Sequence, residues 1–176
     1  MAKKKKKFPE PNQQIQHALL FESARGSVLA GHGQLDVMLE TLLHAEFSRR
    51  SAGAEDSIQW LFEATLQSFH VKNVMAYILN LIDHKTFTAL QKLKDLRNHF
   101  AHHPGEVRLT YERVNAVFEQ LDDVSKLEID EADNRNISSP ESAPQMRFAQ
   151  VALALMRILE ASTIAINGND KQENKR

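Results

Sequence analysis

Apolar residues recur at steps of three and four between positions 28 and 47, and this spacing constrains the fold more than any other feature. Such steps place side chains along one side of an α-helix, whereas a half-buried strand would alternate every second residue. We therefore predict a long helix that buries one stripe. A shorter helix, from about Asn12 to Phe21, should precede it or run continuously into it. The stripe comprises Val28, Leu35, Met38, Leu39, Leu42, Leu43 and Phe47.

The same helical pattern continues towards the C-terminus, and polar residues mark where helices start. Asp56 or Ser57 can cap a short helix through Phe62, Ser68 can cap one over residues 69–81, and Asp83 can start the next. In the 69–81 helix the predicted inward residues are Val71, Val74, Met75, Ile78 and Leu79, and in the helix after Asp83 they are Phe87, Leu90, Leu93, Leu96 and Phe100.

Two further helices complete the prediction. Tyr111 to Leu121 is amphipathic, and Gln145 to Ile166 is apolar around most of its circumference, as expected of a central helix or a dimer contact. The polar link from Asp122 to Pro144 should be a loop. Glycines at 26, 31 and 33 each cost a helix up to about 1 kcal/mol relative to alanine, so they predict close backbone contact unless they are merely tolerated.

The chain length and composition fit one helical domain. It has 176 residues, of which 42% are hydrophobic, and no cysteine, so disulfides and thiol chemistry are excluded. We predict an all-α bundle of about five to seven helices over residues 12–166, between a basic flexible tail at 1–11 and a disordered polar tail at 167–176. No apolar run approaches the roughly 20 residues of a membrane span and no signal-peptide core follows the first lysines, so we expect a cytoplasmic protein.

The charge is distributed unevenly along the chain. The net charge is −1, but without the lysines at positions 3–7 the remainder has 17 basic and 23 acidic residues, a net charge of −6. The five lysines could hold a nucleic acid through its phosphates without reading its sequence, or could simply aid solubility. They are Lys3, Lys4, Lys5, Lys6 and Lys7.

The segment from Leu96 to Gly105 carries the residues best suited to chemistry. Asn98 and His102 are four residues apart and share a helix face, while Arg97 points about 140° away from His102. Because Pro104 disfavours a helical conformation in the residue before it, the helix should end near His102. Arg97 and His102 can act at one site if the helix end departs from regular helical geometry, or if a second copy of the chain supplies one of the two residues.

The pattern Arg97-Asn98-x-x-Ala101-His102 resembles the Arg-x4-His signature of HEPN domains, small helical bundles of which many dimerise and cut RNA. Residues from about Phe21 to His103 also resemble the mannitol repressor family, in Arg25-Gly26, in Gly33 to Glu40 and in Ser68-Phe69-x-x-Lys72. The two resemblances imply the same fold but different activities, and we keep both.

The HEPN resemblance implies metal-independent RNA cleavage at a dimer cleft, as in toxin or phage-defence ribonucleases. His102 can transfer protons near neutral pH, Arg97 can bind phosphate oxygens, and Asn98 can orient either group. Asp36 and Glu40 could support Arg97 or a histidine, or could be ordinary surface carboxylates. Arg97 and the histidines could also merely stabilise the helix C-terminus. The supporting residues would be Asp36, Glu40, His99 and His103.

Other classes of function are less well supported. His99, His102 and His103 lack a nearby carboxylate, so we expect no metal and no other cofactor. No helix-turn-helix, zinc finger or basic recognition helix is evident, so direct DNA reading is not expected. The mannitol repressor resemblance therefore implies the alternative, a non-catalytic transcriptional regulator that acts through protein partners. The expected partners are a second copy, with RNA or a regulatory protein such as an antitoxin.

Overall fold

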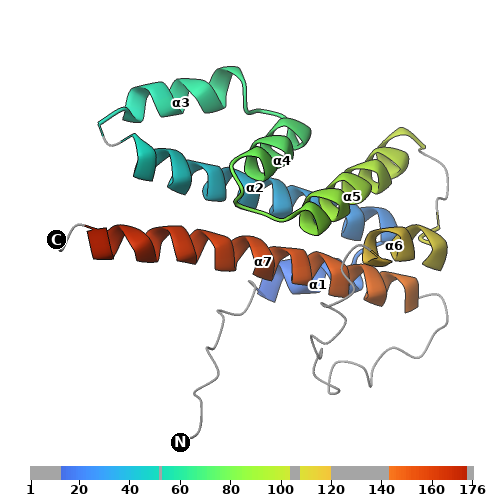
Figure 1. The fold of residues 1–176 in the computed structure, drawn as a ribbon. Helices are drawn as coiled ribbons and strands as arrows, with labels where there is room; N and C mark the ends of the chain where they lie inside the picture. The colour runs from blue at the N-terminus through green and yellow to red at the C-terminus, as the bar shows by residue number, and fades with distance from the viewer. Residues whose placement is uncertain (1–12, 52, 104–107, 120–142, 174–176) are drawn as a thin grey trace, which may run out of the picture.

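The computed structural model describes residues 13–51, 53–103, 108–119 and 143–173. These residues form seven α-helices and, within the described ranges, no strand, so the predicted all-α class is confirmed (Figure 1). The lysines at 3–7 lie outside the described residues. The helices are α1 (Gln13–Phe21), α2 (Ala24–Arg50), α3 (Glu55–Ala64), α4 (Phe69–Ile78), α5 (His84–His102), α6 (Tyr111–Phe118) and α7 (Ala143–Glu173).

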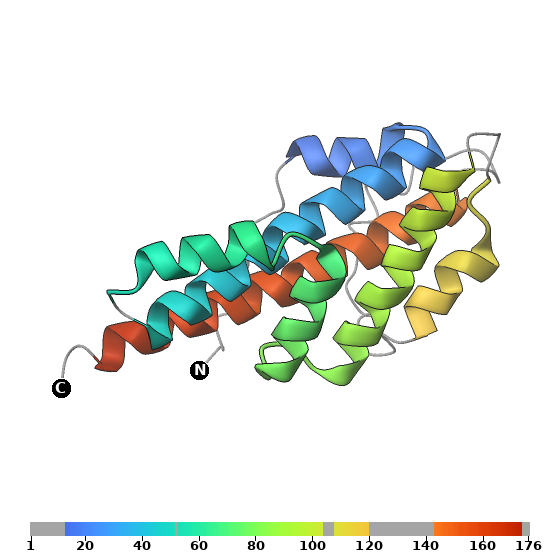
Figure 2. The ribbon, with the colours of Figure 1, turned by 90° about the horizontal axis from the view of Figure 1, so that it is seen from above.

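Helices α2 and α7 form the long axis of the bundle and run side by side in the same direction (Figures 1 and 2). Helix α1 packs on both, while α3, α4 and α5 pack on the other side of α2. Gly31 lies at the α2–α7 crossing, where an added Cβ would meet Leu19 at 3.1 Å and Phe148 at 3.2 Å. The predicted close contact is therefore real at Gly31, but Gly33 faces open space.

Polar side chains cap most of the helices. The Val71 N–H donates to Ser68 Oγ at 3.2 Å and the Thr86 N–H donates to Asp83 Oδ1 at 2.8 Å, which confirms both predicted caps. Ser23 caps α2, so α1 and α2 are separate helices. The short helix α3 is present as predicted, but its predicted cap was wrong, because α3 begins one residue before Asp56 and Ala54 at its start provides no side-chain cap.

The inward face of α4 differs from the prediction. Its buried residues are Phe69, Lys72, Asn73 and Ala76, whereas Ile78 is 63% exposed and Val71, Val74, Met75 and Leu79 are only partly buried. Apolar spacing misled the prediction because two polar side chains on the inward face have specific partners. Asn73 donates to the carbonyl of Phe87 at 3.1 Å, and Lys72 forms ion pairs. In α5, by contrast, Leu90, Leu93, Leu96 and Phe100 are buried as predicted, and Phe87 packs against this core partly buried.

Four helix ends differ from their predicted positions. Helix α3 ends at Ala64, two residues later than predicted. Helix α4 ends at Ile78 and α6 ends at Phe118, both three residues early. Helix α7 continues to Glu173, so residues 167–173, predicted as the start of a disordered tail, are helical. Gly168 costs only about 1 kcal/mol and no proline follows it, so a long helix that is already formed can extend past it.

Helix α7 is also apolar enough to match a membrane span. Residues 143–168 contain an 18-residue window of mean hydropathy 1.5, which the separate apolar runs in the sequence did not reveal. In the bundle this helix buries Phe148, Val151, Leu155 and Leu159 against its neighbours. The core helix of a bundle and a membrane span share this composition, and the packing on α2 accounts for it here.

Candidate functional site

The candidate site is built on the C-terminal half of α5. The buried residues Leu90, Leu93, Leu96 and Phe100 fix this helix against the core and thereby set the direction of the polar residues between them. His102 is the last helical residue, and His103 has an extended backbone, with φ −113° and ψ 92°. The helix thus ends where Pro104 predicts.

Arg97 and Asn98 are hydrogen-bonded to each other, and neither is bonded to His102 within the described residues. Both are partly buried, and Arg97 Nη1 donates to Asn98 Oδ1 at 3.2 Å. His102 is exposed, and no hydrogen bond or ring contact joins it to Arg97 or Asn98 within the described part of the chain. One protomer therefore presents the arginine and the histidine on different sides of α5, as the helical geometry predicts.

The other two histidines of the segment contact each other. The rings of His99 and His103 stack with their centroids 4.4 Å apart, and the His103 Nδ1–H donates to the carbonyl of His99 at 2.8 Å. Partial burial and the nearby charges of Arg113 and His103 lower the pKa of His99. This pair closes the end of α5, which accounts for His103 as a capping residue.

Asp36 and Glu40 on α2 hold a lysine on α4. Lys72 Nζ lies 3.0 Å from Asp36 Oδ1 and 2.7 Å from Glu40 Oε2, and its side chain is only 3% exposed. Burial alone would lower the pKa of Lys72, but the hydrogen bonds and charges of Glu40 and Asp36 raise it. The ammonium is therefore charged at neutral pH. These three residues line one wall of a cavity of about 360 Å³ between α2, α3 and α4.

His32 on α2 is a further polar residue that interacts electrostatically with Lys72 and Arg97. Its partly buried ring contacts the ring of Phe69, with centroids 4.3 Å apart. Burial and then the charge of Arg97 lower the pKa of His32 to about 4; Asp36 opposes them, and the charge of Lys72 adds the smallest lowering. His32 is therefore neutral at pH 7 and lies within electrostatic reach of Arg97.

This arrangement leaves Arg97 without a carboxylate. Since Lys72 holds both Asp36 and Glu40, these acids do not orient Arg97, and within the described residues Arg97 forms no ion pair. Its contact is the neutral amide of Asn98. A partly buried guanidinium with an uncompensated charge is well suited to binding an anion.

Sequence reasoning missed His32, although a signal was present. His32, Asp36, Glu40 and His44 recur at every fourth position of α2 and so form one polar stripe on a helix otherwise identified by its apolar stripe. Lys72 entered only as part of a family resemblance. The buried partner of the stripe could not be identified from spacing alone, because lysine side chains are seldom buried.

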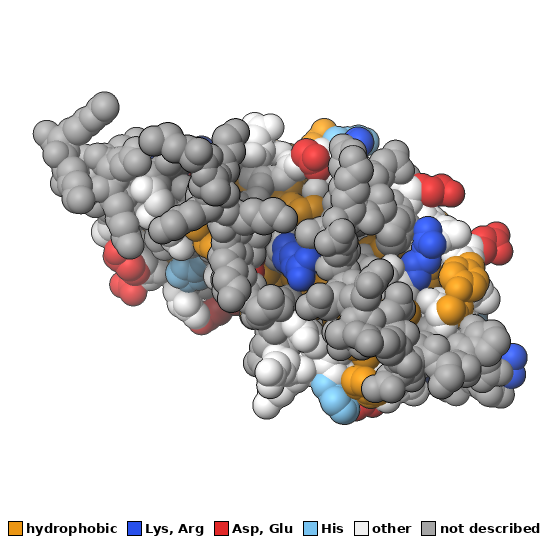
Figure 3. Space-filling view, turned by 90° about the horizontal axis from the view of Figure 1, so that it is seen from below, with side chains coloured by type: hydrophobic (Ala, Val, Ile, Leu, Met, Phe, Trp, Pro, Cys, Tyr) orange, Lys and Arg blue, Asp and Glu red, His pale blue; other side chains and the backbone are white. Residues whose placement is uncertain are grey.

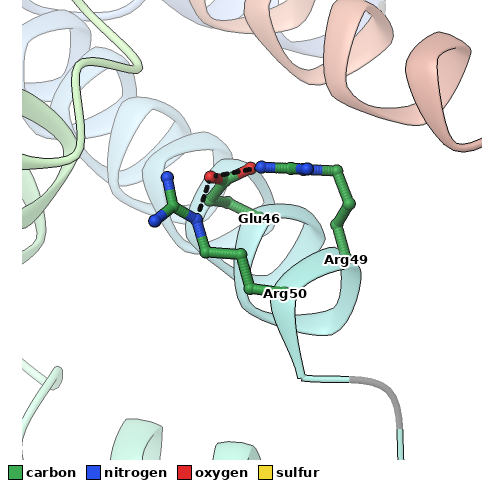
Figure 4. A network of polar contacts seen from close by, with 3 residues as sticks. All are labelled: Glu46, Arg49 and Arg50. Atoms are coloured by element: carbon green, nitrogen blue, oxygen red, sulfur yellow. Dashed lines mark hydrogen bonds and ion pairs between the residues drawn. The ribbon is translucent and has the colours of Figure 1, made fainter.

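A second charged cluster occupies the C-terminal end of α2 (Figure 4). Buried Glu46 accepts hydrogen bonds from Arg49, at 2.9 Å and 3.0 Å, and from Arg50. The hydrogen bond from Arg49, the largest effect, lowers the pKa of Glu46 despite its burial. The three residues belong to consecutive turns of one helix, so this cluster stabilises a helix end.

No other strong candidate is evident among the described residues. On the face seen in Figure 3 the described charged side chains are of both signs and scattered, without a continuous basic area. In the described ranges no group of three or more histidine, aspartate or glutamate side chains could hold a metal ion.

Comparison of the chain with known protein families, with characterised proteins and with solved structures found no match.

Proposed function

We propose that this protein is a metal-independent endoribonuclease of the HEPN type, acting through Arg97, Asn98 and His102. The observation that carries the proposal is the guanidinium of Arg97, which is partly buried, held by Asn98 at 3.2 Å and not neutralised by Asp36 or Glu40. A cation in this state can stabilise the negative charge that develops on a phosphodiester during cleavage.

The proposed reaction needs only proton transfer and charge stabilisation. The ribose 2′-oxygen attacks phosphorus while a histidine takes its proton, and the bond from phosphorus to the 5′-oxygen breaks as that oxygen receives a proton. The products are a 2′,3′-cyclic phosphate and a 5′-hydroxyl. His102 transfers protons, Arg97 stabilises the phosphorane, and Asn98 orients Arg97.

The separation of Arg97 from His102 in one protomer favours a site shared by two copies. A dimer would let His102 of one chain act on a phosphate held by Arg97 of the other. Val37 on α2 and Ile164 on α7 are exposed, and a cavity of about 440 Å³ lies between these helices, so this side offers apolar surface for a second copy. Light scattering should give a mass near twice that of the 20.0 kDa chain.

In this proposal the protein acts in the cytoplasm, with RNA as the substrate and an antitoxin as the controlling partner. The lysines at 3–7 would add sequence-independent affinity for RNA. Their deletion should then weaken RNA binding, flatten its dependence on salt and leave thermal stability unchanged. Unchanged binding after the deletion would leave these lysines as an aid to solubility.

A second candidate is the non-catalytic regulator of the mannitol repressor type. It is favoured by two large apolar side chains that face solvent, Trp60 at 65% and Ile78 at 63% exposure. Such residues are common in protein contacts, and a regulator without a DNA-reading element would need a partner protein.

Cleavage of a labelled RNA pool by purified protein in EDTA tests the choice. The expected result is cyclic-phosphate ends, with at least about a 100-fold lower rate for His102→Ala and for Arg97→Ala, and retained folding. His103→Ala is the matched control, because it removes the adjacent histidine and should reduce the rate much less. Absence of cleavage over a broad set of RNAs, or cleavage that survives His102→Ala, would refute the nuclease and favour the regulator.

A further inference from the structure

Helix α3 lies at the edge of the bundle, over the C-terminal half of α2 (Figures 1 and 2). Its main packing partner is α2, and its buried residues are Ile58 and Phe62. Trp60, the only tryptophan of the chain, points away from them, and its side chain is 65% exposed. One exposed apolar side chain is common in any protein, so the surroundings of Trp60 decide whether it matters.

Those surroundings are acidic. Asp56 and Glu63 lie one turn before and one turn after Trp60, so the three side chains share the outer face of α3. Both acids are exposed, and neither forms an ion pair within the described residues. The donor to Glu63 is the neutral amide of Gln59, at 2.6 Å. Residues 51–69 include no lysine, arginine or histidine, so α3 carries no cation to balance these charges.

The acidic face continues into the cavity of about 360 Å³ between α2, α3 and α4. Gln59 and Glu63 line this cavity, and they flank Trp60 along the helix, so the indole lies beside it. The lining includes one ammonium and three carboxylates, those of Lys72, Asp36, Glu40 and Glu63. Although Lys72 pairs with Glu40, the side chain of Glu40 is still 51% exposed. We call Asp56, Trp60, Glu63 and the adjoining cavity the α3 surface.

We propose that the α3 surface binds a basic segment of a partner protein, with an arginine of that segment placed on Trp60 and Glu63. A guanidinium can stack on an indole while it donates two hydrogen bonds to a carboxylate. A second cation of the segment would enter the cavity and contact Glu40. Charge complementarity selects this class of partner, because the same carboxylates repel the phosphates of a nucleic acid or of an anionic membrane. The inference goes beyond the proposed ribonuclease and does not depend on RNA cleavage.

The test selects short peptides from a random library displayed on phage, with the full-length protein as the immobilised target. The enriched peptides should be rich in arginine and lysine, and their binding should weaken at high salt. A synthesised, labelled copy of an enriched peptide is then titrated with each protein and followed by fluorescence polarisation. Trp60→Ala and Glu63→Lys should each weaken its binding by about 10-fold or more.

Two variants on other helices are the matched controls. Phe21→Ala removes an aromatic side chain of α1 that is 69% exposed, and Glu112→Lys reverses an exposed acid of α6. Both should bind the peptide within about 2-fold of the parent protein. Circular dichroism of every variant verifies that it is folded.

The fluorescence of Trp60 gives a second measurement that needs no variant. Because the chain has no other tryptophan, the bound peptide should protect the emission of the unaltered protein from quenching by acrylamide. Deletion of residues 1–11 tests the chain's own lysines as the rival occupant. If that deletion alone makes Trp60 more accessible to acrylamide, the α3 surface belongs to this segment and the separate partner is overturned.

Three other results would also overturn the inference. They are the absence of enriched basic peptides, an affinity unchanged in folded Trp60→Ala and Glu63→Lys, and unchanged quenching of Trp60 by acrylamide when the peptide is bound. None of these measurements involves RNA cleavage, so their failure leaves the proposed ribonuclease standing, and failure of the cleavage assay leaves the α3 surface standing.

Discussion

Helix α2 carries two clusters of charged side chains that are partnered in different ways. At its C-terminal end, Glu46 is bound by Arg49 and Arg50 of the same helix, so sequence neighbours complete the cluster. At its middle, Asp36 and Glu40 are bound by Lys72 from another helix, 32 or more residues away in sequence. The ion pairs of the first cluster form within one helix, whereas those of the second require the fold.

The two clusters differ in what they hold together. At the end of α2, Arg49 and Arg50 share the carboxylate of Glu46, and all three belong to the same helix, so this cluster stabilises the end of that helix. In the middle of α2, Lys72 of α4 binds both Asp36 and Glu40, so this cluster joins two helices. Within the described residues, neither Asp36 nor Glu40 forms an ion pair with Arg97.

The largest effect expected at pH 7 is that of Lys72→Met. Removal of the ammonium leaves two carboxylates without a cation, and the loss for a fully buried pair is about 3–5 kcal/mol. Asp36 is 31% and Glu40 is 51% exposed, so water will partly replace the lysine, and we expect the free energy of unfolding to fall by about 2–3 kcal/mol. Urea denaturation of both proteins at pH 7 measures this fall in the free energy of unfolding.

Lys92→Met provides the control for that variant. Lys92 is exposed on α5 and has no ion pair within the described residues, so its loss should change the free energy of unfolding by less than about 0.5 kcal/mol. Equal effects of the two variants would show that the ion pairs of Lys72 contribute no more than an exposed charge, and the contrast between the clusters would be lost.

His32 should make the protein less stable in acid. Its pKa is about 4 in the folded chain and 6.5 in the unfolded chain, so the unfolded state binds more protons between these values. The free energy of unfolding should therefore be highest above pH 6.5 and should fall by up to about 3 kcal/mol as the pH drops to 4. His32→Phe keeps a ring beside Phe69 and cannot titrate.

Denaturation curves of the parent protein and His32→Phe, recorded at intervals between pH 7 and 4, measure this contribution. The difference between the two proteins isolates His32 from the carboxylates, which titrate in both. Parallel curves would mean that the imidazole is as easily protonated in the folded state as in the unfolded state, and that His32 is not in the environment described here.

The sequence predicts the helices better than their contacts. Periodicity and capping identify α2, α5 and the starts at Ser68 and Asp83 because these depend on residues within one turn. The inward face of α4 could not be predicted, since Lys72 and Asn73 are buried by partners on α2 and α5. Likewise, the motif indicates Arg97 and His102, but the neutral state of His32 depends on side chains from three helices.

Glu46→Gln should have the smallest effect. Glutamine keeps the shape of the buried side chain and one acceptor oxygen, but it loses the charge that binds both arginines. Because the side chains of Arg49 and Arg50 are 29% and 51% exposed, they can return to water, and the loss should be about 1 kcal/mol at pH 7. The pKa of Glu46 is lowered in the folded protein. The stabilisation by its charge is therefore fully present above the ordinary pKa near 4.5 and is lost as the pH falls through the lower folded-state pKa. The parent protein and Glu46→Gln should then have similar free energies of unfolding in acid. Urea denaturation at pH 7 and pH 3 compares them. A loss at pH 7 larger than that of Lys72→Met would reverse the ranking, and would mean that the cluster within one helix, rather than the cluster between helices, contributes more to the stability of the bundle.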